Sequence, residues 1–195
     1  MKKLVAAMVA VDALVIALVA WLLQQSFIPD RRVLILAYLF PIAFTFHVVE
    51  EFVFPGKGED WFRLYRPRFA LRYTEAYFVK VNAIGFAGAA LVPLGLYDYR
   101  GGYSLGGIFG NMIFAAAMLA NAYYHVRGSI VTKQYSPGTI TGVVLYVPLA
   151  IAFYVQLLRT GAASWIVAII CLIAGSQVQR VIDSTHEHAL AKRSS

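Results

Sequence analysis

Six long apolar runs, separated by turn residues, determine what this chain can fold into. They cover residues 4–23, 33–53, 73–96, 105–126, 139–158 and 162–182. Each is close to the ~20 residues that an α-helix needs to cross the hydrocarbon core of a bilayer. Turn-forming pairs such as Pro55-Gly56 and Gly101-Gly102 lie between the runs. We therefore expect an all-α, polytopic membrane bundle of about six transmembrane helices, in a single domain over residues 1–195.

The composition agrees with a membrane protein. Hydrophobic residues make up 60% of the chain and charged residues 14%, whereas soluble domains carry roughly 25% charged residues. The first run follows Met1-Lys2-Lys3, as a signal peptide would. It is long, includes Asp12 and lacks a convincing cleavage site, so we expect a retained helix. The net charge of +7 must be interpreted loop by loop in such a protein, and nucleic acid is not an expected partner.

The distribution of lysine and arginine predicts the orientation. With a cytoplasmic N-terminus, twelve basic residues fall on the cytoplasmic side and four on the other, and Lys80 lies within a run, which accounts for all 17. Cytoplasmic loops carry the excess of these residues. We therefore expect a multi-pass protein of the inner membrane with both termini in the cytoplasm.

One histidine and two carboxylates lie together near the end of the second run. Glu50 and Glu51 follow His47 by three and four residues, so a helix places all three on one side. An ionised group in hydrocarbon costs on the order of 3 kcal/mol, and such groups generally have a function. Alternatively, the glutamates extend to the interface or pair with arginines of the following loop. That alternative does not account for His47, which lies a full turn deeper.

A second polar pair, Asn121 and His125, lies in the fourth run with helical i, i+4 spacing. Imidazole and carboxylate ligands suit zinc, iron or manganese, and two histidines with one carboxylate leave a position for water or substrate. We predict a divalent metal, zinc or iron, bound by His47, Glu51 and His125, with Glu50, Glu51 and Asn121 as catalytic residues. The sequence does not decide which glutamate is the ligand and which the base. The alternative for Asn121 and His125 is an interhelical hydrogen bond, worth about 0.6 kcal/mol in membranes.

Further polar residues fall at the same predicted depth, at the cytoplasmic ends of the third and sixth runs. We expect them to be accessory residues of one pocket built by four helices: Glu75, Lys80, Asn82, Gln177 and Asp183. Lys80 either neutralises a nearby glutamate or extends to the membrane surface.

The pattern His47-x-x-Glu50-Glu51 followed by Asn121-x-x-x-His125 resembles the HXXEE domain family of small bacterial integral membrane proteins. The Tyr-Ser-Pro-Gly stretch at 135–138 is similar to that family's pattern too. The resemblance covers about residues 33–182 and implies the five motif residues as the functional set. The family is essentially uncharacterised. Its polar residues suggest a membrane enzyme, with metal dependence as one option, and the resemblance supplies no reaction.

Three functions agree with these features. The first is a metal-dependent, hydrolase-like membrane enzyme acting on a lipid-like or amphipathic substrate. The second is a metal-free acid–base isomerase or cyclase of isoprenoid-like substrates, in which Tyr73, Tyr77, Tyr123 and Tyr124 stabilise a cation. The third is a transporter or ion-binding protein, although the sequence shows no inverted repeat. The expected partners are membrane lipids and a hydrophobic or amphipathic small molecule; the sequence does not indicate an oligomeric state.

Overall fold

The computed structural model describes residues 1–25, 30–97, 102–178, 180 and 181. Across these residues the chain is helical apart from turns and one isolated bridge between Tyr97 and Tyr103. Five helical segments are long and apolar enough to cross a membrane. They are α1 (Lys2–Leu22), α2 (Arg31–Phe52), α4 (Glu75–Leu91) with η2 (Val92–Gly95), α5 (Leu105–Thr132), and the continuous span of α6 (Thr139–Thr141), η3 (Gly142–Tyr146) and α7 (Val147–Arg159). The expected all-α fold is confirmed, and these five segments are candidate membrane-spanning helices.

The sixth predicted span corresponds to α8 (Trp165–Ser176), an apolar helix of 12 residues. At 1.5 Å per residue it is about 18 Å long, shorter than a hydrocarbon core of about 30 Å. The predicted run extended to residue 182, and residues 179 and 182 lie outside the described residues. The count of six therefore stays a prediction. α8 packs closely on α5, because a Cβ on Gly175 would lie 2.4 Å from the Cβ of Ala116.

Capping residues determine where the long helices begin. Asp30 accepts a hydrogen bond from the backbone N–H of Arg32 (2.9 Å) at the start of α2, and Thr74 accepts one from Tyr77 (3.2 Å) at the start of α4. Such side chains satisfy backbone N–H groups that have no partner within the helix. These starts lie within two residues of the predicted ones. The end of α5 differs more, because the polar residues after Val126 continue the helix to Thr132. Its 28 residues span about 42 Å, which exceeds the hydrocarbon thickness.

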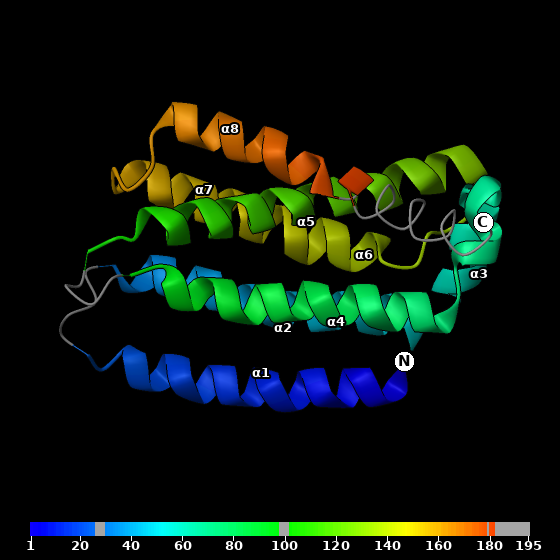
Figure 1. Cartoon of the computed structure of the whole chain (residues 1–195), viewed down its shortest axis with the longest axis horizontal. Helices are drawn as coiled ribbons and strands as arrows, with labels where there is room; N and C mark the ends of the chain where they lie inside the picture. The colour runs from blue at the N-terminus through cyan, green and yellow to red at the C-terminus, as the bar shows by residue number, and fades with distance from the viewer. Residues whose placement is uncertain (26–29, 98–101, 179, 182–195) are drawn as a thin grey trace, which may run out of the picture.

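The long helices lie side by side and alternate in direction (Figure 1). α3 (Gly58–Tyr65) lies across one end of the bundle, at the right of Figure 1. The N-terminus, the last turns of α2 and α5 and the first turns of α4 and α6 all lie at this end, which we call the α3 end. Motifs that are far apart in the sequence therefore meet at one end of the molecule.

The main apolar core lies between α2, α5 and α7. Phe40 and Phe153 pack edge to face at 5.2 Å between ring centroids, beside the fully buried Met112. Gly142 permits a close approach of η3 to α5, since its Cβ would lie 3.2 Å from Ala122. This packing fixes α2, α5 and the 139–159 span relative to one another, and these three segments carry the site.

Candidate metal centre

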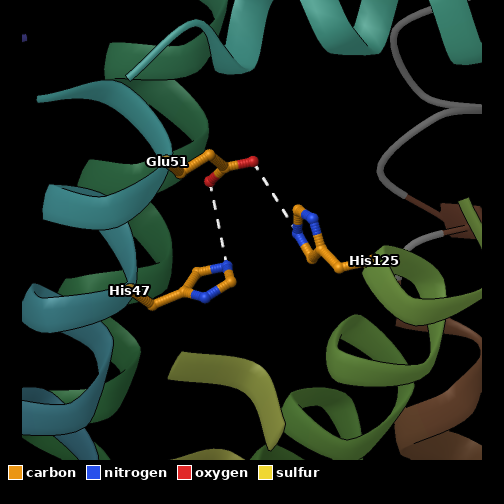
Figure 2. Close-up of side chains that lie close together, drawn as sticks. All are labelled: His47, Glu51 and His125. Atoms are coloured by element: carbon orange, nitrogen blue, oxygen red, sulfur yellow. Dashed lines mark ion pairs between the residues drawn. The ribbon is translucent and has the colours of Figure 1, made fainter. Parts of the chain in front are cut away.

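Two histidines and one carboxylate converge inside the α3 end. His47 and Glu51 lie one turn apart on α2, and His125 comes from α5 (Figure 2). One ligand atom from each lies within 4.8 Å of the others. The side chains are almost completely buried, with exposed fractions of 3% for His47, 6% for Glu51 and 0% for His125. Helix packing therefore brings together ligand types that suit a transition metal.

The separations between Glu51 and the two histidines fit a shared ion better than direct hydrogen bonds. Glu51 Oε2 lies 3.8 Å from Nε2 of His47, and Glu51 Oε1 lies 3.8 Å from Nε2 of His125. Both distances are too long for hydrogen bonds. Two ligands that each lie about 2.1 Å from one metal are separated by at most about 4.2 Å. The carboxylate therefore stands at a distance from each imidazole that one intervening cation can bridge.

The second nitrogen of each imidazole is held by a hydroxyl group. His47 Nδ1 lies 3.0 Å from Thr141 Oγ1, and His125 Nδ1 lies 2.7 Å from Ser136 Oγ. The two Nε2 atoms are buried and have no hydrogen-bond partner within the described part of the chain. Histidines that bind metals have this arrangement, in which an outer partner orients the ring and the other nitrogen faces the ion. The residues present thus fit a metal.

The hydrogen bonds around Thr141 assign the tautomer of His47. Thr141 Oγ1 donates its single proton to Glu50 Oε2, at 2.5 Å. The same oxygen therefore accepts from Nδ1–H of His47, which leaves a lone pair on Nε2. That lone pair faces the carboxylate of Glu51. Two acceptors facing each other in a buried site are unfavourable unless a proton or a cation lies between them.

Glu50 has a different environment from Glu51, although the two are adjacent. It accepts hydrogen bonds from the hydroxyl of Tyr135, the backbone N–H groups of Ile140 (3.0 Å) and Thr141 (2.7 Å), and the hydroxyl of Thr141. These four bonds tie the 135–141 segment to α2. Burial, together with the neighbouring Glu50 carboxylate, raises the pKa of the Tyr135 phenol, so this hydroxyl stays protonated and continues to donate. The role of Glu50 as a catalytic base stays a prediction.

Gly138 lets the chain pass directly beside both imidazoles. Its φ is +99°, a conformation that favours glycine. A Cβ at this position would lie 2.6 Å from Cε1 of His47 and 3.0 Å from Cε1 of His125. No other residue type fits here without displacing the rings.

Aromatic residues of α3 cover the centre at the end of the bundle. The Trp61 ring is 4% exposed and stacks on His125, with 5.5 Å between centroids and 27° between planes. A Cβ on Gly128 would lie 2.3 Å from the Trp61 ring, and one on Gly58 would lie 2.8 Å from Cγ of Glu51. Two glycines therefore let α3 seat tightly over the ligands, which restricts water on this side.

A pocket of about 630 Å³ adjoins the centre. His47 and Glu51 line it, together with Asn121 and Tyr146. Tyr146 lies in the π-helical turn η3, with its ring centroid 4.7 Å from that of His47. Within the described residues, the Tyr146 hydroxyl and Oδ1 of Asn121 are buried without a hydrogen-bond partner. The volume is typical of ligand pockets, and these polar atoms are available to a ligand.

The structure brings some of the predicted site residues together and leaves others apart. Lys80 and Asn82 line the pocket with Asn121. Glu75 instead pairs with the N-terminal amino group of Met1. Gln177 bonds to Ser176 and accepts a hydrogen bond from Arg180, and Asp183 lies outside the described residues.

Sequence reasoning missed several residues that support the centre. They are Trp61, Ser136, Gly138, Thr141 and Tyr146, which touch or orient the ligands. The stretch at 135–138 could have indicated some of them. A Ser-Pro-Gly turn directly before a span can place backbone and hydroxyl groups inside a bundle. Trp61 offers a weaker signal, as an aromatic residue in a loop rich in arginine.

The motif order and spacing match one family model, described as "Protein of unknown function with HXXEE motif", over residues 38–153. No curated protein and no solved structure matches the chain. The matched region includes His47, Glu51, His125 and the whole 135–146 segment, and it leaves out α1 and α8. Because this region is more than half of the 195 residues and contains the entire centre, the chain belongs to the family of proteins with the HXXEE motif.

Proposed function

We propose that this protein is an enzyme of the inner membrane that binds one divalent metal, zinc or iron, and acts on a lipid-like or amphipathic substrate. The observation that supports this most is the convergence of His47, Glu51 and His125 beside a pocket of about 630 Å³. Both Nε2 atoms face Glu51, and nothing else in the described residues bonds to them. Such a group leaves coordination positions open on the pocket side.

The metal, when bound, supplies Lewis-acid polarisation of a substrate oxygen and activation of water. The side chains around it have distinct proposed roles. The amide of Asn121 holds a polar group of the substrate, and the hydroxyl of Tyr146 donates a hydrogen bond into the pocket. Glu50 acts as a positioning residue, because its four donors leave it little capacity to accept a further proton. Trp61 and α3 keep water out from the end of the bundle.

The metal-free isomerase or cyclase has less support from the geometry. Of the four tyrosines invoked to stabilise a cation, Tyr77 lines the pocket, whereas Tyr123 is 67% exposed. The transporter alternative has no observation that favours it.

Metal analysis of detergent-purified protein tests the proposal. After reconstitution with zinc or iron, we expect about one metal per chain in the wild type, and loss of that metal in Glu51→Gln and His125→Ala. Asp60→Asn is the matched control, since it removes an exposed carboxylate at the same end of the molecule. Equal metal content in all four proteins, or none in the reconstituted wild type, would contradict a metal centre at these residues.

The proposed orientation has its own test. The N-terminus and the turn at 133–138 lie at the α3 end, where the basic residues 57–72 also lie. We expect a reporter fused to Met1 and one inserted at Lys133 to be both cytoplasmic. A periplasmic signal from the first would reverse the proposed side of the pocket.

A further inference from the structure

We infer that the substrate of this site is a single-chain amphiphile with an anionic headgroup, bound with the headgroup at Lys80 and the hydrocarbon chain in a groove between α4 and α5. The inference rests on the proposed function, because it assigns the substrate of that same site. It goes further by naming which helices hold the chain and which side chain selects the charge.

The pocket is elongated along α4. It is lined by α4 and η2 from Tyr77 to Val92 and by α5 from Gly110 to Asn121, and α2 lines a further side. From Lys80 to Val92 the helix rises about 18 Å, more than half the thickness of a hydrocarbon core of about 30 Å. The groove therefore has the length for one extended chain that starts near the metal centre.

Away from the centre the groove is apolar and is kept open by glycine. A Cβ on Gly88 would lie 3.7 Å from the Phe114 ring, and one on Gly110 would lie 3.0 Å from Val92 Cγ1. Larger side chains at these positions would fill the groove. Its apolar lining consists mainly of Phe44, Ile84, Val92, Ile113, Phe114 and Met118. These side chains suit a hydrocarbon chain and offer it no polar partner.

The polar groups of the pocket lie at the end of the groove next to the metal centre. His47 Nε2 and the Tyr146 hydroxyl lie in side chains that are 2% and 1% exposed, and both lack a partner in the described chain. Both residues line the same pocket as the apolar groove. A ligand in the pocket can supply the hydrogen-bond partner that each of these two atoms lacks. The groove is thus one ligand site with an apolar part and a polar part.

Lys80 lies at the polar end and at the depth of the metal ligands. It follows the start of α4 by five residues, and His47 precedes the end of α2 by five, both at the α3 end. Lys80 and Ile84, one turn apart, are exposed and also line the pocket, so the groove opens beside them on the outer surface of the bundle. A ligand can enter there from the bilayer.

The charge of Lys80 determines the kind of headgroup. No described residue forms an ion pair or hydrogen bond with its amine. A lysine at this depth in a membrane requires an anion or a polar surface. A phosphate or carboxylate headgroup supplies the anion directly beside the metal centre, and the chain of the same molecule then extends along α4.

Chain binding is tested by filling the groove. Purified protein in a non-ionic detergent is titrated with hexadecyl phosphate and with octyl phosphate, and bound ligand is followed by native mass spectrometry. We expect Gly88→Leu to weaken hexadecyl phosphate by at least about tenfold and octyl phosphate by less than about twofold. Gly106→Leu is the control, because no described atom lies within 4 Å of a Cβ there. Equal affinities of wild type and Gly88→Leu for hexadecyl phosphate would overturn the groove.

Headgroup binding is tested by removing one positive charge. We expect Lys80→Gln to weaken hexadecyl phosphate by about tenfold and to leave hexadecanol unchanged. Lys3→Gln removes the same charge from an exposed position on α1 and should change neither. Identical behaviour of the two variants would show that Lys80 contacts only bilayer headgroups and would overturn the anionic assignment.

Metal content is measured on the same preparations, so that the two proposals fail separately. Gly88→Leu and Lys80→Gln should hold as much metal as the wild type. A wild type that binds hexadecyl phosphate but no metal would contradict the proposed metal enzyme and would still support the chain-binding groove. A fully metallated wild type that binds hexadecyl phosphate no better than Gly88→Leu does would end the groove and leave the metal centre.

Discussion

Each end of the bundle carries a carboxylate between helices, half-buried Asp30 at one end and buried Glu51 at the other, and the two differ in how many hydrogen bonds they accept. At the end opposite α3, Asp30 accepts hydrogen bonds from the Arg32 backbone (2.9 Å) and from Gln156 (2.8 Å), and its carbonyl accepts one from Tyr97 (2.8 Å). At the α3 end, Glu51 faces two imidazole nitrogens at 3.8 Å that have no partner in the described residues. The hydrogen bonds of Asp30 thus connect α2 to α7 and to Tyr97. Glu51 is instead separated from each imidazole nitrogen by 3.8 Å, too far for a hydrogen bond.

We interpret this difference as that between a structural polar cluster and the proposed metal centre. A polar group that has its hydrogen-bond partners stabilises the position of its helix, as Asp30 does for α2 and α7. A buried nitrogen without a partner is unfavourable, and at His47 and His125 two such nitrogens face the same carboxylate. Adjacent residues can belong to different kinds of cluster. Glu50 directly precedes Glu51, yet it accepts four hydrogen bonds and in this respect resembles Asp30.

The largest expected effect comes from substituting each of these two carboxylates in turn and comparing metal content and stability. Glu51→Gln should abolish metal binding, because the ligand charge is lost. It should leave the stability of the metal-free protein unchanged or higher, since Glu51 makes no hydrogen bond to the described residues that the substitution would remove. Asp30→Ala should keep the metal and lower stability by about 2 kcal/mol, roughly 4–8 °C in Tm, through loss of the helix cap and the Gln156 bond.

Metal content is measured on each purified variant. The stability of the metal-free form is then measured by thermal unfolding in the presence of a chelator. If Glu51→Gln melted well below Asp30→Ala and kept its metal, the assignment of functional and structural carboxylates would be reversed.

Two glycines provide a second contrast between the ends. Gly138 and Gly161 both have positive φ, +99° and +71°. Alanine in this region costs roughly 1–2 kcal/mol of backbone strain. At Gly161 no described atom lies within 4 Å of the added Cβ, whereas at Gly138 the Cβ would lie 2.6 Å from the His47 ring. We expect Gly138→Ala to lose more stability than Gly161→Ala, because steric overlap with the rings adds to the backbone strain. We expect Gly138→Ala alone to lose metal affinity, by about 100-fold.

Isothermal titration with zinc and thermal unfolding of the two alanine variants give the comparison. Parallel losses of metal affinity at both positions would mean that the backbone strain, and not contact with the imidazoles, is responsible.

The sequence predicted the scaffold and the ligands better than the support around them. Hydrophobic length and turn residues predicted the spans, and the starts of α2 and α4 came within two residues, because both signals depend on local chemistry. His47 and Glu51 could be predicted to lie together because they are four residues, about one helical turn, apart. The pairing of Glu50 with the 135–141 segment depends on how two distant spans pack, and no local pattern encodes it. The stacking of Trp61 on His125 likewise required the position of α3.

The smallest expected effect comes from the hydroxyl that orients His47. Thr141→Val keeps the shape of the side chain and removes the acceptor for Nδ1–H, along with one of the four donors to Glu50. A buried N–H then loses its partner, and the ring loses the hydrogen bond that fixes its tautomer. We expect metal affinity to fall by about 10–100-fold without being abolished, as for other groups that orient metal ligands.

Thr160→Val is the matched control at the opposite end, where the hydroxyl bonds to carbonyl groups of its own helix, Gln156 O at 3.0 Å and Leu157 O at 3.1 Å. Zinc titration should separate the two variants, with Thr160→Val indistinguishable from the wild type. Wild-type affinity in Thr141→Val would show that His47 is oriented without this hydroxyl. The contacts of the ring with Tyr146 and the close approach of Gly138 would then be sufficient to hold it. Because those contacts restrict the plane of the ring but not its protonation, we expect the hydroxyl to be needed.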